Sequence, residues 1–149
     1  MFRRFSALWV SVLVIVSAAA IARAADAPTI VLPGQGTYAQ APNPYPAGTM
    51  AAVLVGDPMK AGSLYTVRLK LPANAKIPPH THGDTENVTV ISGTVLVGLG
   101  TKFDAAKMMP LPAGSFVSIP ANTPHYAMAK DDVVLQVSGM GPGSMTLVQ

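Results

Sequence analysis

Two histidines and one glutamate lie close together near the middle of the chain. His80 and His82 are two positions apart, and Glu86 follows four positions later. On an extended strand, side chains two positions apart point to the same side, so both imidazoles face one way. Glu86 is an even number of positions from both histidines, so on a continuous strand it would face the same side. Gly83 is a point at which that strand can be interrupted. These three side chains would supply most of a metal-binding shell.

A fourth ligand would come from elsewhere in the chain, and His125 is the one remaining histidine. Imidazole nitrogens and a carboxylate oxygen suit zinc, iron, manganese, nickel or copper, and suit calcium poorly. The chain has no cysteine, which excludes disulfides, thiolate metal sites, a cysteine nucleophile and a lipoprotein-type anchor. Any metal must therefore be held by histidine, carboxylate or methionine side chains.

The segments around these residues have the pattern of β-strands. Residues 63–71 alternate, and one face carries Tyr65, Val67, Leu69 and Leu71. Many short segments of this kind, separated by Gly- and Pro-containing turns, predict an all-β sandwich or barrel. Further strands are expected at residues 49–55, 87–99 with a tight turn at Gly93, 107–111, 115–119, 123–129, 133–138 and 146–149.

Residues 1–24 have the features of a signal peptide. Arg3 and Arg4 form a positive region, residues 7–21 carry no charge, and small residues surround Arg23 before the expected cleavage point. A permanent membrane anchor is the alternative, but the apolar run is short for a span of about 20 residues. We therefore expect a periplasmic or secreted bacterial protein that has no membrane segment after cleavage.

The remaining chain divides into a short arm and one domain. Residues 25–48 are rich in Pro, Gly and Ala, which predicts an extended arm or linker, and residues 49–149 form the expected barrel domain. Three of the ten Lys and Arg residues precede residue 25, which leaves seven against seven Asp and Glu. The mature chain is near neutral, and the sequence shows no basic patch of the kind that nucleic acid needs. Charged residues make up only 11% of the chain, which favours burial of surface in a homo-oligomer such as a homodimer.

The histidine segment resembles the first conserved motif of the cupin superfamily. The spacing agrees with the family from His80 through His82 and Glu86 to Gly93. The leading Gly of that motif, expected six residues before His80, is replaced by Asn74. Asn tolerates a left-handed backbone better than most residues, so a turn at this position is plausible.

The second cupin motif is matched from Gly114 through Pro120 to His125. Its usual second Gly is Asn122, which is again a tolerable exchange. Its terminal Asn is replaced by Ala129, a departure at a position that is not a metal ligand in the family. The chain is therefore similar to a small exported cupin of a single domain.

The resemblance implies a jelly-roll β-barrel of six to eight strands with one divalent metal inside. His80, His82, Glu86 and His125 would be the ligands, leaving one or two positions for water, oxygen or a substrate. Iron or manganese would suit oxygen chemistry, whereas zinc or nickel would suit isomerisation, hydrolysis or lyase chemistry. No nucleotide-binding loop or other organic cofactor site is expected.

Membership of a fold family does not specify a reaction. One hypothesis is a metal-dependent enzyme, of the dioxygenase, isomerase or lyase type, acting on a small organic molecule. The alternative is a non-catalytic module that binds a metal or a small ligand. Glu86, the only Glu, and Tyr65 are candidate catalytic residues, although Tyr65 also suits core packing. Arg68 lies on the polar face of its strand, which weighs against a substrate with several acidic groups.

Overall fold

The computed structural model describes residues 27–148, so the expected signal peptide at 1–24 lies outside the described residues. Among residues 27–148, no helix is both long and apolar enough to span a bilayer. The elements in this range are β1 (Ala39–Gln40), β2 (Met50–Val55), β3 (Leu64–Leu71), β4 (Lys76–His82), β5 (Glu86–Ser92), β6 (Thr94–Leu99), the short 3-10 helix η1 (Ala105–Lys107), β7 (Met109–Pro112), β8 (Phe116–Ile119), β9 (His125–Ala129), β10 (Val133–Met140) and β11 (Met145–Leu147).

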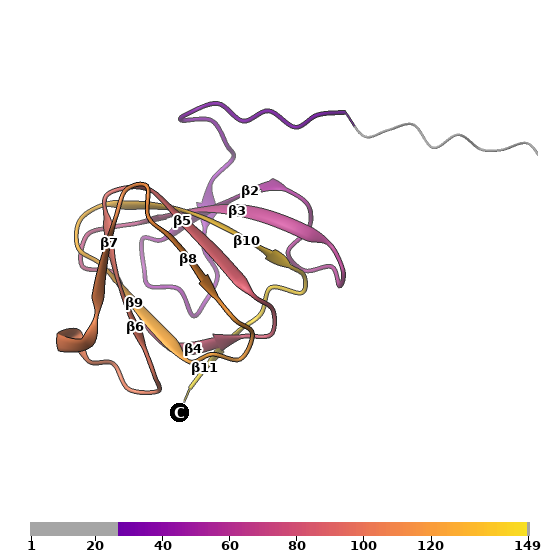
Figure 1. Cartoon of the computed structure of the whole chain (residues 1–149). Helices are drawn as coiled ribbons and strands as arrows, with labels where there is room; N and C mark the ends of the chain where they lie inside the picture. The colour runs from indigo at the N-terminus through magenta and orange to yellow at the C-terminus, as the bar shows by residue number, and fades with distance from the viewer. Residues whose placement is uncertain (1–26, 149) are drawn as a thin grey trace, which may run out of the picture.

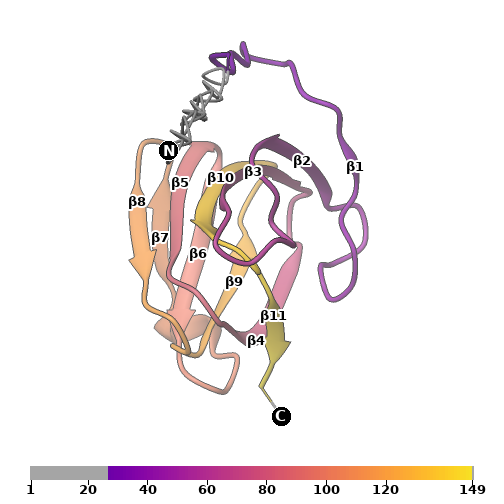
Figure 2. The same ribbon diagram turned by 90° about the vertical axis from the view of Figure 1, so that its right-hand side faces the viewer.

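The strands form two antiparallel sheets that face each other (Figures 1 and 2). The six-stranded sheet has the order β1-β2-β3-β10-β5-β8, and the five-stranded sheet has the order β11-β4-β9-β6-β7. Strands that are neighbours in a sheet are mostly distant in sequence, as in the pairing of β3 with β10. The predicted all-β, jelly-roll barrel is therefore confirmed.

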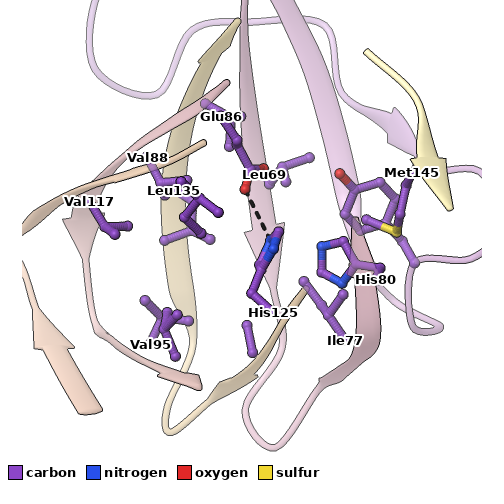
Figure 3. A pocket seen from close by; sticks show the side chains of 15 residues that line it. Leu69, Ile77, His80, Glu86, Val88, Val95, Val117, His125, Leu135 and Met145 are labelled. Carbon is purple, nitrogen blue, oxygen red and sulfur yellow. Dashed lines mark ion pairs between the residues drawn. The ribbon is translucent and has the colours of Figure 1, made fainter. Parts of the chain in front are cut away.

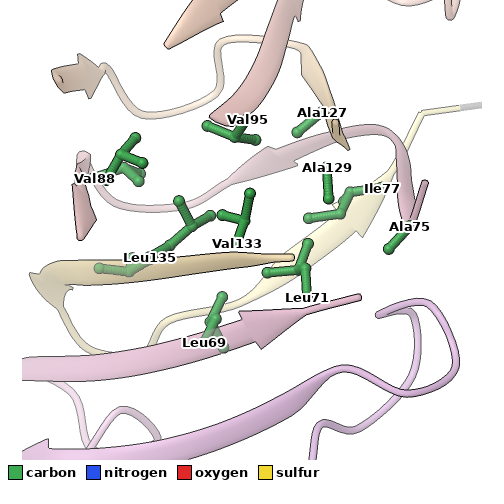
Figure 4. Packing of buried hydrophobic residues seen from close by; sticks show 12 residues of the cluster. Leu69, Leu71, Ala75, Ile77, Val88, Val95, Ala127, Ala129, Val133 and Leu135 are labelled. Carbon is green, nitrogen blue, oxygen red and sulfur yellow. The ribbon is translucent and has the colours of Figure 1, made fainter. Parts of the chain in front are cut away.

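The hydrophobic core fills the space between the sheets (Figure 4). In β3, Leu69 and Leu71 are buried while Lys70 between them is exposed, as the alternation predicts. Val133, Leu135 and Val137 of β10 are likewise buried. Side chains on alternate positions of a strand share one face, so the two sheets bury their inward faces against each other.

Two asparagines take the left-handed backbone conformation that the cupin motifs require. Asn74, before β4, has a φ of 66°, and Asn122, before β9, has a φ of 61°. The expected tight turn between β5 and β6 lies at Gly93, with a φ of 76°. A Cβ atom there would clash with the carbonyl oxygen of Asp132, so the turn has room only for glycine.

Several strands differ in extent from the expected ranges. The strand expected at 107–111 begins only at Met109, because η1 precedes it and Asp104 accepts a hydrogen bond from the backbone of Ala106. No range was predicted for the strand that carries His80 and His82; it begins at Lys76 and contains two prolines, accommodated by a register shift in its pairing with β9. The last strand starts at Met145.

Candidate metal centre

Three histidines from two neighbouring strands converge inside the barrel. His80 and His82 lie on β4, and His125 is the first residue of β9, where it pairs directly with His80. All three are buried, and one nitrogen atom from each lies within 4.8 Å of the others. The alternation of side chains on β4 places both imidazoles on the inner face, as the spacing predicts.

Each of the three imidazoles donates a hydrogen bond to a backbone carbonyl. A carbonyl oxygen can only accept, so Nδ1 carries the proton and Nε2 of the neutral ring keeps a free lone pair. Such contacts orient the ring of a metal-binding histidine and make its free nitrogen more basic. The pairs are His80 with Pro78 (2.7 Å), His82 with Ser144 (2.8 Å) and His125 with Thr123 (3.0 Å).

Glu86 approaches two of these free nitrogens from the opposite sheet. Its Oε2 lies 3.4 Å from His125 Nε2, the contact marked by the dashed line in Figure 3. Its Oε1 lies 3.6 Å from His82 Nε2. His82 Nε2 is buried and has no hydrogen-bond partner among the described residues. A buried lone pair without a donor is costly unless a cation uses it. The donor set therefore fits a divalent transition metal, and the role of Glu86 as a fourth ligand stays a prediction.

Burial and mutual proximity shift the pKa values of the site. Burial lowers the pKa of His80 to about 4, with further lowering by the charges of His125 and His82. Burial alone would raise the pKa of Glu86, but hydrogen bonding with His125 and the nearby imidazoles outweigh it and lower that pKa. Burial would lower the pKa of His125, but the Glu86 carboxylate outweighs it and raises that pKa. Without metal, the contact between His125 and Glu86 favours a proton on His125, whereas His80 is neutral at physiological pH.

The centre opens onto a small apolar cavity of about 40 Å³ (Figure 3). That space exceeds the roughly 10–15 Å³ that one water molecule needs. Its polar lining residues are His80, Glu86, His125 and Tyr45. The apolar lining is Leu69, Ile77, Val88, Val95, Val97, Val117, Ile119, Ala127, Leu135, Val137 and Met145. The site can therefore hold a small ligand in a mainly apolar environment next to the metal position.

Tyr65 lies next to the centre rather than in the lining of this cavity. It is buried, and its hydroxyl donates to Asp84 Oδ2 at 3.3 Å. The same oxygen accepts a hydrogen bond from the backbone N–H of Met140 at 3.0 Å. Tyr65 and Asp84 thus connect β3 and the end of β10 to the turn between His82 and Glu86. A catalytic role for Tyr65 stays a prediction.

Two residues of the cavity lining were not anticipated from the sequence. Tyr45 comes from the Pro-rich arm and Met145 from the last strand, at opposite ends of the described chain. A loop has no periodicity that predicts where a side chain points. The one feature of the sequence that could have drawn attention to Tyr45 is its aromatic side chain between Pro44 and Pro46. Arg68, as expected, stays on the polar face, where its guanidinium donates to Gln136 at 2.8 Å.

The match to a known domain agrees with this geometry. The sequence model of the family described as "Cupin domain" matches residues 67–137, which include all four expected ligands. The chain belongs to the cupin superfamily. This cupin has no match among curated proteins.

Solved structures with the same fold are numerous, and their sequence identity to this cupin is low. The polyketide cyclase RemF from Streptomyces resistomycificus is 17% identical, with a TM-score of 0.68 over 83% of this chain and 87% of that chain. An RmlC-like cupin from Shewanella frigidimarina is 16% identical, with a TM-score of 0.59 over 76% and 91%. KdgF from a Halomonas species is 19% identical, with a TM-score of 0.58 over 76% and 94%. At such identities these similarities establish the fold alone.

Proposed function

We propose that this cupin is an exported, metal-dependent enzyme of the dioxygenase, isomerase or lyase type that acts on a small organic molecule. One observation carries the proposal: three imidazoles, each oriented by a backbone carbonyl, converge beside an apolar cavity, and two of them, His80 and His125, line it. A site used only for structure would have no need of a cavity beside it. Export is inferred from residues 1–24.

His80, His82 and His125, with Glu86 as fourth ligand, would hold one divalent ion. With four protein ligands, an octahedral ion keeps two positions for a substrate or water. The ion would polarise a carbonyl or enolate oxygen, activate water, or support oxygen chemistry if it is redox-active. Iron, manganese, zinc, nickel and copper all suit this donor set.

The protein's own residues would exclude water and handle a proton. Valine and leucine side chains line the cavity, and this strengthens every electrostatic interaction inside it. His125 and Glu86 lie 3.4 Å apart and can share a proton. No Arg or Lys among residues 27–148 lines the cavity, so an uncharged substrate fits it better than a polyacid. One protein with the same fold is named a polyketide cyclase, and a mostly apolar substrate suits the cavity found here.

A non-catalytic binding module is the second candidate. It is favoured by the scarcity of acid–base groups, since Glu86 is the one carboxylate in the cavity lining and already lies close to two histidines. General acid–base catalysis needs a group free to exchange protons with the substrate. A module of this kind would hold a small ligand at the metal without changing it.

The first test is the metal content of the protein purified from its own host. We expect about one equivalent of transition metal in the wild type and in Lys102→Ala, an exposed control, and less than a tenth in His82→Ala. Iron or manganese would direct the search to oxygen chemistry, and zinc or nickel to isomerase and lyase reactions. A metal-free wild type would contradict the proposal.

Enzyme and binding module are separated by incubating the metal-loaded protein with small-molecule extracts of its host. An enzyme consumes one compound, makes another, and stops when His82 is replaced by Ala. A module retains one compound stoichiometrically and releases it unchanged on denaturation.

Export is tested by sequencing the N-terminus of the protein from the periplasm or medium, where we expect Ala25 as the first residue. Protein that still begins at Met1 there would contradict cleavage.

A further inference from the structure

The Pro-rich arm forms a closed loop that reaches the metal centre. The loop spans residues 41–49, and the backbone N–H of Ala41 donates to the carbonyl of Thr49 at 2.8 Å. Both end residues are buried, whereas Tyr45 stands at the middle of the loop. In Figure 2 the chain leaves β1, loops beside the barrel and returns to β2. A compact loop with joined ends is an Ω-loop, a form that often carries function.

Among residues 27–148, Tyr45 is the one polar member of the cavity lining that is not an expected metal ligand. The other polar members are His80, Glu86 and His125. No hydrogen bond joins the Tyr45 hydroxyl to another described residue, so the hydroxyl is free to serve a ligand. Burial, and then the negative charge of Glu86, raises the pKa of Tyr45 above its ordinary value of 10. The phenol stays neutral at physiological pH and can donate a hydrogen bond.

We propose that Tyr45 determines specificity by donating a hydrogen bond to a carbonyl or hydroxyl oxygen of a small, uncharged, mostly apolar ligand. The apolar part of that ligand would lie against side chains such as Val95, Val117 and Leu135 (Figure 3). A hydroxyl in a water-poor cavity discriminates well, because a ligand without an acceptor leaves it unpaired. The inference rests on the proposed function, because Tyr45 would add a residue of the Pro-rich arm to that proposed site.

The test uses two neutral probes of similar shape, cyclohexanone with an acceptor oxygen and methylenecyclohexane without one. Binding to the full chain loaded with Zn²⁺ is followed by NMR of the valine and leucine methyl groups. We expect the wild type to prefer cyclohexanone by about fivefold, the value of one hydrogen bond of roughly 1 kcal/mol in a buried site. Tyr45→Phe should abolish most of that preference while binding methylenecyclohexane within about twofold of the wild type.

Tyr38→Phe is the matched control. Tyr38 belongs to the same arm, but its ring packs under Lys70 Nζ at 3.8 Å and does not line the cavity. It should keep the full preference for cyclohexanone. An unchanged preference in Tyr45→Phe would assign the ketone to the metal and overturn the inference, as would the absence of saturable binding of both probes to the wild type. Zinc content, measured in the same samples, reports separately on the metal centre.

Discussion

His82 on β4 donates its Nδ1 proton to the carbonyl oxygen of Ser144, 62 residues further along the chain, at 2.8 Å. The segment that carries Ser144 connects β10 to β11 and is held nearby by the hydrogen bond from the Met140 backbone to Asp84. The orientation of one expected ligand therefore depends on the last residues of the fold. Backbone partners of this kind affect metal affinity because they orient the ring.

Gly143→Ala should weaken metal binding without removing a ligand. An added Cβ would lie 2.6 Å from the Tyr65 hydroxyl, so the segment must shift and carry the Ser144 carbonyl away from His82. We expect the dissociation constant for Zn²⁺ to rise by about 10- to 100-fold, the usual effect of losing such a partner. Gly83→Ala is the control, since its Cβ would meet only Ser144 Oγ at 3.4 Å. Equal affinities in competition titrations would contradict this relationship.

Glu86→Gln tests whether the carboxylate is a ligand. Removing its charge while keeping its shape should raise the dissociation constant for Zn²⁺ by at least about tenfold, because an amide oxygen is a poorer ligand for this ion. Asp104→Asn, which alters a carboxylate paired at the surface with Lys107, should leave the affinity unchanged. Wild-type affinity in Glu86→Gln, measured by isothermal calorimetry, would restrict the ligand set to the three histidines.

Metal binding should release a proton from His125. Burial would lower the pKa of His125, but the Glu86 carboxylate outweighs it and raises that pKa above 6.5, whereas the pKa of His80 is about 4, so His125 keeps its proton to a higher pH than His80 does. Affinity should therefore increase as pH rises through and above 6.5. Calorimetry in buffers of different ionisation enthalpy measures the released protons. Glu86→Gln should reduce the release at neutral pH, and an unchanged value would show that Glu86 does not hold the proton on His125.

The metal-free protein should lose stability as pH falls from 6.5 towards 4. His80 takes up its proton near pH 6.5 when unfolded and only near pH 4 when folded, because burial lowers its folded pKa. Between these values the unfolded state binds more protons, so the free energy of unfolding decreases as the solution becomes more acidic. His80→Asn should show a shallower decrease in urea titrations performed with a chelator. An identical slope would contradict the shifted pKa.

Gly98→Ala should destabilise the fold where β6 pairs with β9. Gly98 on β6 pairs with Tyr126 on β9, and an added Cβ would clash with the fully buried Tyr126 ring. Moving that ring would also disturb its hydrogen bond to the Asp104 carbonyl. We expect a loss of about 1–3 kcal/mol in the free energy of unfolding. Thr101→Ala, in the exposed bend that follows β6, should stay within about 0.5 kcal/mol of the wild type. Equal stability of Gly98→Ala and the wild type in urea titrations would contradict this packing.

Local pattern was sufficient for much of the fold. The period of two in residues 63–71 identified the inward face of β3, because neighbouring side chains of a strand must point to opposite sides. The same rule placed His80 and His82 together. Asn74 and Asn122 were recognised as turn positions because their side chains tolerate positive φ. These properties belong to a residue and its immediate neighbours.

The partners of those residues were decided only by the tertiary structure. Nothing in the order of residues links His82 to Ser144, Tyr65 to Asp84, or Tyr45 to the cavity, since each pair depends on which strands and loops come together in space. The alternation placed Tyr65 inward without revealing what its hydroxyl contacts. The sequence by itself determined the kind of fold and which three imidazoles could bind a metal. Long-range strand pairing determined how those imidazoles are oriented and which side chains, Tyr45 among them, line the cavity beside them.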